Sequence, residues 1–522
     1  MTKYLALTIG PIYETFAQVK KTRAVWAASY FFSWFMKELT IQTNKDGFKI
    51  LMPALNGDQV TFDSQYGSGL YADRIYFEPS GKTKADLENI VKNIIAGIAK
   101  EIDPTRKELV ENYLKQYLNI HIMEVDISEK GKVLKTMNDL LDQKELMQNY
   151  VFEISENHLI NYLEEKAKDG FLALAAFGEN YKERNFRSVS EIATSTLYRS
   201  GEKTKYIKAL RDDFKSEDTD LIKELEEQKF DIFPYHKYYA VMYADGDNIG
   251  ALLKAVSDDF DKLKGFSKQL FEFGQYAEKI IADYGGNGIY LGGEDILAFL
   301  PVACINQGKT ETNTIFQLIH DLDVCFGNTI GAYAKENKVE PPTLSYGIMI
   351  SYIKHPLKEA MLIAHELMEN VAKKTPYKNS VALRLQKHSG QHMDCCIEKA
   401  KTCSWSYIKE LVKAYSININ DEKKTERKAN ADLLSGLIHR FKDDMYFEVF
   451  SIAARGNRLE PFFENFFDEK IHRGDDNPKN IFLKKVRELS KKVFNDYPDN
   501  QKCRDIIFTV LRYIHFINAE KE

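Results

Sequence analysis

Two short acidic turns contain the residues whose types and spacing suit chemistry at phosphorus. The first reads Ala244-Asp245-Gly246-Asp247-Asn248, and the second reads Leu291-Gly292-Gly293-Glu294-Asp295. Carboxylate oxygens are the ligands that hard divalent ions prefer, and two such ions close together can stabilise both the attacking and the leaving oxygen of an in-line displacement. If the two turns meet, the sequence predicts a two-metal site for phosphoryl transfer, with Mg²⁺ or Mn²⁺ held by Asp245, Asp247, Glu294 and Asp295.

The same turns have a plainer interpretation. Acidic turns with glycine are common on protein surfaces, so a solvated turn is the better explanation of either motif taken alone. Four carboxylates brought together would repel one another, which makes such a cluster unfavourable unless cations neutralise it. Because each motif follows an apolar run of the kind that forms a buried strand, the two motifs together favour the metal site.

Short apolar runs must position these carboxylates. Residues 238–243 are aromatic and β-branched residues ahead of an Asp-Gly turn, which predicts a strand with the first two carboxylates at its end. Residues 288–291 and 296–300 flank two glycines, which tolerate the positive φ angles of a tight turn. We therefore expect a hairpin with the other two carboxylates at its tip.

The order of elements along the 522 residues predicts an α+β chain of four domains. Strands and helices alternate over residues 1–127, and helical periodicity rich in Glu and Lys follows over residues 128–234. Residues 235–390 combine strands with helices that would cover one face of a sheet, as in a ferredoxin-like palm. Residues 391–522 carry a helical pattern, which predicts a helical C-terminal domain.

The first domain shows a weak internal echo of the third. A strand-like run at residues 4–10 precedes a long helical stretch, as residues 238–247 do, but it ends in Gly10-Pro11-Ile12 where the later copy has carboxylates. We therefore predict two palm-like domains of ferredoxin type, a first that is degenerate and a second that is catalytic. A helical connector would join them.

Composition bears on the compartment and the partners. The formal charge is −5 with 29% charged residues, so no global basic signature indicates nucleic-acid binding. Any such contact must come from local patches or from partner subunits. No apolar run is long enough to span a bilayer and no signal-like segment begins the chain, which predicts a cytoplasmic protein without membrane contact.

The cysteines do not indicate a disulfide framework, because six in a chain of this length are too few. One local group has enough members for a zinc site: His388, His392, Cys395, Cys396 and Cys403. It contains no CxxC pair, and buried thiols with surface imidazoles explain it as well. We do not expect zinc, and whether these residues bind a metal is left open.

The motifs match a known family over more than the acidic turns. Residues 239–250 and 290–301 resemble the palm of the large polymerase-like subunit of type III CRISPR effector complexes, particularly the Cmr kind. Later landmarks of the same palm are Leu344-Ser345-Tyr346-Gly347-Ile348, Ala372-Lys373 and Ser389-Gly390-Gln391. The opening Thr8-Ile9-Gly10-Pro11 with Lys21-Thr22-Arg23 resembles the degenerate first palm of that family.

This resemblance implies a cyclase inside an RNA-guided antiviral complex. Members bind guide RNA through partner subunits and, when target RNA pairs with the guide, join ATP molecules into a cyclic oligoadenylate. On this basis the four carboxylates would hold two Mg²⁺ or Mn²⁺ ions, Lys373 would neutralise triphosphate charge, and Ser267 would line the adenine pocket. The remaining residues expected to bind nucleotide are Gly246, Asn248, Gly292 and Gly293.

Departures from the family pattern change the expectation. The chain starts directly at the first palm and its first histidine is His121, so we expect neither the His-Asp nuclease domain of the family nor cleavage of single-stranded DNA. The usual Asp-Asp pair is Glu294-Asp295 here, which keeps the charge at a longer reach. We expect activity to survive, while the product length or the acceptor joined to the adenylate can differ. The usual cysteine-pair zinc site is also missing.

Two other functions stand beside the cyclase. A catalytically silent scaffold subunit of the same ribonucleoprotein would keep the palm only for assembly. The carboxylates argue against it, because an abandoned metal site would lose its like-charge repulsion through mutation. A free-standing cyclase of the diguanylate type would turn over GTP without RNA, and the large helical segments would then lack an evident purpose.

Overall fold

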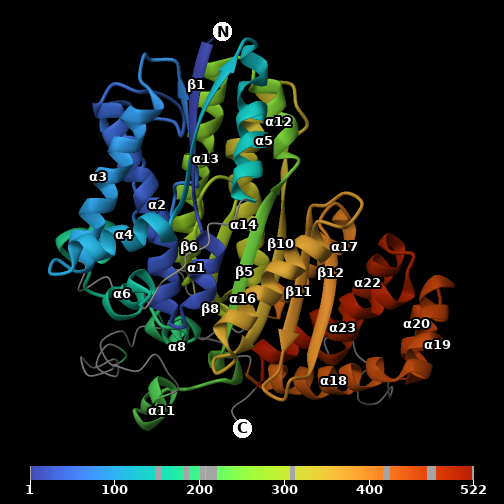
Figure 1. The fold of residues 1–522 in the computed structure, drawn as a ribbon. Coiled ribbons are helices and arrows are strands. Elements are labelled where there is room, and N and C mark those ends of the chain that lie inside the picture. Colours follow the sequence, from blue (N-terminus) through green and yellow to red (C-terminus); the bar gives the residue numbers. More distant parts are fainter. Residues whose placement is uncertain are drawn as a thin grey trace.

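The computed structural model contains two main β-sheets with helices packed around them (Figure 1). It describes residues 2–146, 156–180, 187–199, 206, 220–305, 312–415, 424–466 and 478–519. No helix within these ranges combines the length and the apolar character that crossing a lipid bilayer requires. The predicted α+β class is confirmed.

The first sheet has four strands in the order β2-β3-β1-β4, with β1 between two antiparallel neighbours. Its strands are β1 (Thr2–Gly10), β2 (Lys49–Met52), β3 (Arg74–Glu78) and β4 (Asn119–Ile127). Its helices are α1 (Ile12–Gln18), α2 (Thr22–Lys45), α3 (Lys84–Ile102) and α4 (Lys107–Tyr117). Trp26, Phe31 and Phe35 of α2 are fully buried, so this long helix supplies much of the core beside the sheet.

Helices connect the two sheets in the described part of residues 128–234. They are α5 (Val133–Glu145), α6 (His158–Lys166), α7 (Phe171–Phe177), α8 (Val189–Ala193), α9 (Ser195–Arg199) and α11 (Asp220–Glu227). α8 begins at a capping box between Ser188 and Glu191 and packs on β5 and β7 of the second sheet. The connector is therefore part of the packed structure around that sheet.

The second sheet has six strands in the order β12-β11-β10-β5-β7-β6. They are β5 (Tyr238–Asp247), β6 (Asn287–Tyr290), β7 (Ile296–Pro301), β10 (Thr343–Tyr352), β11 (Ser380–Gln386) and β12 (His392–Glu398). β10 and β11 run parallel, and the other neighbouring pairs are antiparallel. The predicted β6–β7 hairpin is confirmed, and the strand predicted at residues 238–243 extends four residues further to Asp247.

Helices accompany this sheet, and a small β-ribbon extends it. The helices are α12 (Ile249–Val256), α13 (Phe260–Tyr284), α14 (Ile315–Phe326), α15 (Ala332–Glu336) and α16 (Leu357–Glu366), and the ribbon pairs β8 (Ala303–Ile305) with β9 (Thr312–Thr314). α16 packs on β10 and β5 and continues into a π-helical segment, Leu367–Ala372. This segment ends directly before Lys373.

Six described helices follow the sheet toward the C-terminus (Figure 1, orange to red). They are α17 (Thr402–Ala414), α18 (Lys424–Lys442), α19 (Asp444–Arg455), α20 (Leu459–Phe466), α22 (Pro478–Asp496) and α23 (Asn500–Ile517). The structure differs from the expected helical pattern at residues 392–398, which form β12. A tight turn over Lys387–Gln391, with Gly390 at a φ of +82°, folds this segment back onto β11 as a hairpin.

A loop of the first unit holds the hairpin of the second sheet. Four residues of this loop donate hydrogen bonds to the buried carboxylate of Glu278 on α13: Ser64, Gln65, Tyr66 and Ser68. The N–H of Gly69 donates to the carbonyl of Ile289 at 3.2 Å, and its carbonyl accepts from the N–H of Leu291 at 2.8 Å. The first unit therefore fixes the strand that leads into the second acidic turn.

Candidate active site

Asp247 ends β5 as a fully buried carboxylate. Its Oδ2 accepts three hydrogen bonds, from Thr343 Oγ1 at 2.9 Å, Ser345 Oγ at 2.8 Å and the backbone N–H of Asn379 at 2.9 Å. Its Oδ1 is buried and has no hydrogen-bond partner. A buried carboxylate oxygen without a partner is unfavourable, so this atom is available to a cation or to a water bound by one.

Asp245 lies on the same face of β5, two residues earlier, because side chains alternate along a strand. Lys373 donates a hydrogen bond to its Oδ2 and lies 3.4 Å from Oε1 of Glu369. Burial raises the pKa of Asp245, and the bond from Lys373 opposes that rise. Burial would lower the pKa of Lys373, but its bonds to Asp245 and Glu369 raise it overall, so this lysine carries its charge at neutral pH.

The second acidic turn lies directly against the first. The N–H of Asp295 donates to the carbonyl of Gly292 at 3.3 Å, and Gly293 has a φ of +70°, which favours glycine. A Cβ atom on Gly246 would lie 2.8 Å from the Cβ of Glu294, well inside normal contact distance. The two turns therefore meet, and glycine at position 246 allows them to approach.

Burial and the closeness of the carboxylates raise their pKa values. The surrounding protein, then Glu294, then Asp245 raise the pKa of Asp295, and because this side chain is exposed, solvent screens part of that effect. Burial and then the charge of Asp245 raise the pKa of Glu294. Asp73, from the loop before β3 in the first unit, adds further negative charge to Asp295. Four carboxylates, Asp73, Asp245, Glu294 and Asp295, thus influence one another where the two units meet.

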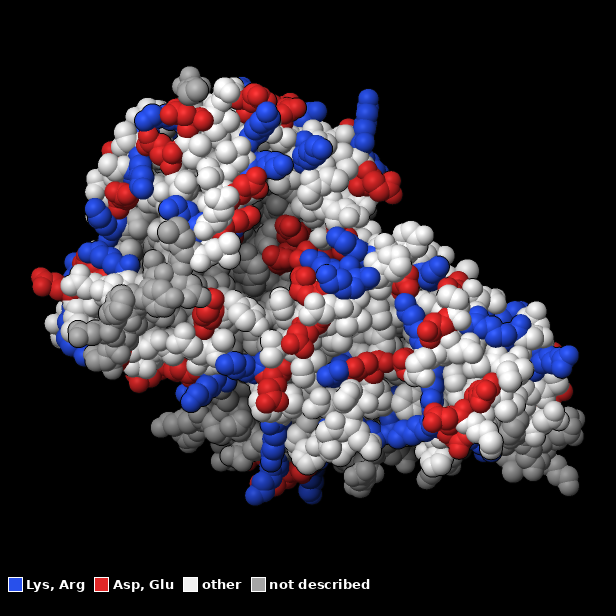
Figure 2. Space-filling view, turned by 45° about the vertical axis from the view of Figure 1, so that its right-hand side comes forward, with Lys and Arg blue, Asp and Glu red and all other residues white. Residues whose placement is uncertain are grey.

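The donor set suits a hard divalent cation, but the ligands do not encircle one. Among the described residues, no three His, Cys, Asp or Glu side chains lie close enough together to hold a metal ion. The unpaired Oδ1 of Asp247 and the mutual rise of the carboxylate pKa values both fit a site that cations complete. In the structure the Lys373 ammonium neutralises Asp245 instead. Figure 2 shows a recess in the molecular surface in which acidic side chains gather, with basic ones on its rim.

Comparison with known proteins assigns the sheet that carries these turns. Residues 238–382 match the family model of the second palm domain of Cas10/Cmr2. The sheet with the two acidic turns is therefore similar to the second palm of Cas10/Cmr2. The predicted resemblance to the large palm subunit of type III CRISPR complexes is confirmed.

A curated relative extends the match to the CRISPR system Cmr subunit Cmr2 of Pyrococcus furiosus. The two proteins are 28% identical over 182 residues, which cover 30% of this chain and 19% of the Pyrococcus protein. The match therefore spans about a fifth of the length of that relative.

Solved structures show a likeness over much more of the chain. The Type III-B Cmr-beta structure in its apo state has a TM-score of 0.50 at 11% identity, covering 76% of this chain and 70% of the matched chain. A Csm1–Csm4 cassette in complex with one ATP has a TM-score of 0.50 at 13% identity, covering 93% and 70%. At these identities the likeness concerns the fold.

Most residues expected to bind nucleotide lie at the two acidic turns. Gly246, Gly292, Gly293 and Lys373 surround the carboxylates, and Asn248 immediately precedes α12 in a left-handed conformation with a φ of +64°. Ser267 lies elsewhere: it is buried on α13, and its Oγ accepts a hydrogen bond of 2.9 Å from the N–H of Ala54. This bond links the palm to the first unit, and the adenine-binding role of Ser267 stays a prediction.

The candidate zinc residues are spread over the edge of the palm. Cys395 and Cys396 are neighbours on β12, so their side chains point to opposite faces, and Cys395 is buried. His388 lies in the turn before β12 and packs its ring on Tyr352, while Cys403 is exposed on α17. These positions are not among any metal-binding group of the described residues.

Sequence reasoning missed the residues that orient Asp247. Thr343 and Ser345 lie opposite Asp247 and Asp245 in the β10–β5 register. Their alternation with apolar residues at the start of a strand was a usable signal, because both must point to one face. Asn379 and Asp73 reach the site from loops, and no local pattern marks them.

Proposed function

We propose that this chain is the large subunit of a type III CRISPR RNA-guided effector complex and acts as a nucleotidyltransferase. When target RNA pairs with the guide, it would join ATP molecules into a cyclic oligoadenylate or a related adenylate messenger and release pyrophosphate. The observation that carries this proposal is the meeting of the two acidic turns on the palm, where Asp247 has one oxygen held by three donors and the other without a partner.

Each carboxylate would have a defined part. Asp245 and Asp247 on β5, with Glu294 and Asp295 from the hairpin, would hold two Mg²⁺ or Mn²⁺ ions. Such ions, when bound, stabilise the charge that develops on the attacking and leaving oxygens of a phosphoryl transfer. Asp247 is pre-oriented, because three donors and a central strand fix its carboxylate before any ligand arrives.

Lys373 would exchange partners when substrate binds. It carries its charge and pairs with Asp245 in the structure, and a triphosphate offers a stronger concentration of negative charge at the same place. Movement of the ammonium from Asp245 to ATP would release that carboxylate for a cation. The ATP in the solved Csm1–Csm4 cassette supports ATP as the substrate class.

The same proposal covers partners and place of action. The Cmr2 match and the fold shared with Cmr-beta support assembly with other Cmr-type subunits, guide RNA and target RNA. The complex would act in the cytoplasm in antiviral defence.

The test is to incubate the assembled complex with labelled ATP, Mg²⁺ or Mn²⁺ and matching target RNA, and to record pyrophosphate and the mass spectrum of the small products. We expect an adenylate product that disappears in Asp247→Asn and Asp295→Ala complexes. Asp139→Asn, an exposed aspartate on α5, is the matched control and should leave the product unchanged. A product of unchanged mass and yield in both site variants would refute the proposal.

A scaffold subunit is the second candidate, and one observation favours it. Lys373 already neutralises Asp245, and no three described carboxylates encircle an ion. A scaffold would assemble with its partners and RNA yet release no pyrophosphate. A GTP arm without RNA in the same assay separates the diguanylate-type alternative, which would turn over GTP as an isolated chain.

A further inference from the structure

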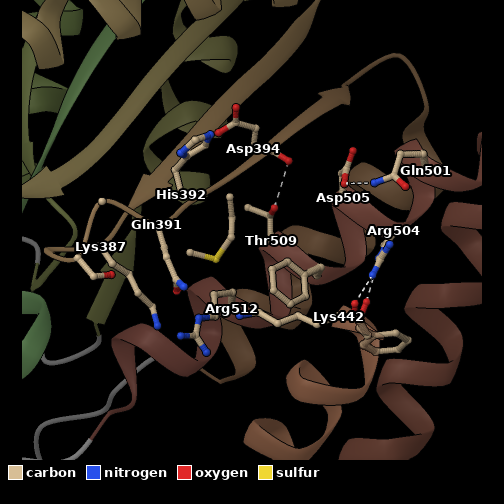
Figure 3. A pocket seen from close by; sticks show the side chains of 15 residues that line it. Lys387, Gln391, His392, Asp394, Lys442, Gln501, Arg504, Asp505, Thr509 and Arg512 are labelled. Atoms are coloured by element: carbon tan, nitrogen blue, oxygen red, sulfur yellow. Dashed lines mark hydrogen bonds between the residues drawn. The ribbon is translucent and has the colours of Figure 1, made fainter. Parts of the chain in front are cut away.

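A second charged region lies at the opposite end of the palm sheet. A pocket of about 780 Å³ opens between the β11–β12 turn and the helices α18 and α23 (Figure 3). Asn379, which bonds Asp247, immediately precedes β11, whereas the turn at residues 387–391 follows its far end. The whole length of β11 therefore separates the pocket from the carboxylates.

Three cationic side chains converge in this pocket. Lys387 comes from the turn, Lys442 from the end of α18 and Arg512 from α23, and Figure 3 shows their charged ends extending toward one another. Burial, then Arg512 and then Lys442 lower the pKa of Lys387. Burial lowers the pKa of Arg512, and burial followed by Arg512 and Lys387 lowers that of His515. These directions agree with the convergence of like charges that Figure 3 shows.

The acidic residues of the pocket are engaged with other partners. The Asp394 carboxylate pairs with Arg384, with N–O distances of 2.8 and 2.5 Å, and Asp505 accepts a hydrogen bond from Gln501 at 2.8 Å. Within the described ranges, no carboxylate pairs with the side chains of Lys387, Lys442 or Arg512. Like charges gathered without counterions are unfavourable, so an anion from outside the described chain would stabilise this arrangement.

The remaining wall of the pocket is apolar and amide-rich. Phe508 and Met393 are partly buried against the core, and Gln391, Gln501 and Thr509 add hydrogen-bonding groups. A basic groove beside aromatic and apolar side chains is the combination by which proteins bind single-stranded nucleic acid, where cations hold phosphates and flat side chains contact bases. An acidic peptide would use the cations but would leave the apolar wall unmatched. The volume lies within the usual range for a pocket that holds a nucleotide-sized ligand.

We propose that this pocket binds the phosphate groups of a nucleotide ligand, supplied either by a single-stranded RNA segment or by a free nucleotide. Lys387, Lys442 and Arg512 hold the phosphates, and the wall at Phe508 and Met393 contacts the base. The site is separate from the carboxylates of the palm, and its existence does not depend on the proposed cyclase reaction.

The experiment measures binding of a fluorescent single-stranded RNA of about eight nucleotides to the purified full-length chain by anisotropy. Lys387→Ala, Lys442→Ala, Arg512→Ala and the triple variant are compared with wild type. Lys491→Ala, an exposed lysine on α22 outside the pocket, is the matched control. Asp247→Asn is included because it should bind RNA as wild type does. Thermal melting checks that each variant is folded. The RNA affinity of each single variant is measured as well, so the test still holds if the triple variant does not fold.

The salt dependence gives a quantitative expectation. For a single-stranded ligand, each phosphate contact contributes about −0.7 to the slope of log affinity against log salt concentration. Three contacts therefore predict a slope of about −2. Affinity should then fall about 20-fold between roughly 50 and 200 mM salt. Each single alanine variant should reduce the slope by about 0.7, and Lys491→Ala should leave it unchanged.

Competition identifies the source of the phosphate. Displacement of the probe by unlabelled RNA alone indicates an RNA segment, and displacement by ATP at similar concentration indicates a free nucleotide. Three results would overturn the proposal: equal affinity of the triple variant and wild type, absence of binding to wild type at low salt, or stronger displacement by polyglutamate than by RNA of equal charge. The last result would assign the pocket to an acidic protein segment.

Discussion

The ends of β1 and β5 are the two regions whose comparison is most instructive. Both are inner strands between antiparallel neighbours, and each is followed by helices that pack in its unit. Near β1, Arg74 pairs with Asp142 at 2.6 Å and Glu145 at 2.9 Å, so both of these carboxylates have a cationic partner. At the end of β5 four carboxylates meet, and Lys373 is the cation that pairs with one of them. Carboxylates that each pair with a cation fit a structural role, whereas carboxylates gathered without cationic partners indicate a ligand of positive charge.

We expect the largest effect from a substitution that disrupts only the site at the end of β5. Asp247→Asn removes a charged metal ligand, which should cost several kcal/mol of transition-state stabilisation and lower the rate of product formation about 1,000-fold. Glu145→Gln, at the charged cluster beside β1, should leave the rate of the complex unchanged. Initial rates of pyrophosphate release measure both, and equal rates for the two variants would show that the β5 carboxylates have no special part.

The next effect tests whether the two acidic turns must touch. Gly246→Ala introduces a Cβ that would lie 2.7 Å from Ile249 Cγ1 and 2.8 Å from Glu294 Cβ, so the hairpin must shift. We expect a loss of about 1–3 kcal/mol in the free energy of unfolding, together with reduced activity. Gly10→Ala is the matched change at the end of β1, where the nearest atom would be 3.8 Å away. Chemical denaturation measures the free energy of unfolding of both variants. Equal losses of stability would show that the close approach of the two turns does not explain the effect.

A smaller effect concerns the cation at the β5 site. Lys373→Met removes a charged partner worth about 1.5–3 kcal/mol, so the KM for ATP should rise at least about tenfold if the lysine binds triphosphate. Lys374→Met changes the exposed neighbouring lysine and should have little effect. Steady-state kinetics of the RNA-activated complex separates the two variants. An unchanged KM in Lys373→Met would limit this lysine to a pairing role in the ligand-free protein.

The smallest expected effect is on the melting temperature, which compares the charge clusters beside β1 and β5 in the absence of any reaction. The surrounding protein and then the neighbouring carboxylates raise the pKa of Asp295, so its ionised form is disfavoured. Because Asp295 is exposed and solvent screens the repulsion, Asp295→Asn should raise the melting temperature of metal-free protein only slightly. Mg²⁺ should stabilise wild type more than this variant. Glu145→Gln should instead lower the melting temperature slightly, since it breaks the pair with Arg74 and the 2.7 Å bond from Thr8. Shifts of the same sign in both variants would contradict the comparison.

Features that depend on residues close together in sequence were predicted correctly, whereas features that depend on distant residues were not. β6 and β7 form the predicted hairpin, because two short apolar runs on either side of a pair of glycines are a local pattern. β12 was missed, because its pairing depends on the hairpin turn rather than on its own mixed composition. The bond between Ser267 and Ala54 and the charge of Asp73 beside Asp295 join residues far apart in sequence. Only the packing of the two units creates such contacts, so no pattern in a single sequence reveals them.

The most direct test of the central claim is a titration of the purified chain with Mn²⁺, followed by electron paramagnetic resonance in wild type and Asp247→Asn, with ATP present. The account predicts that wild type binds two Mn²⁺ ions per chain at the palm and that the variant loses at least one of them. Equal numbers of bound ions with equal affinity in the two proteins would contradict the claim that these carboxylates form a metal site.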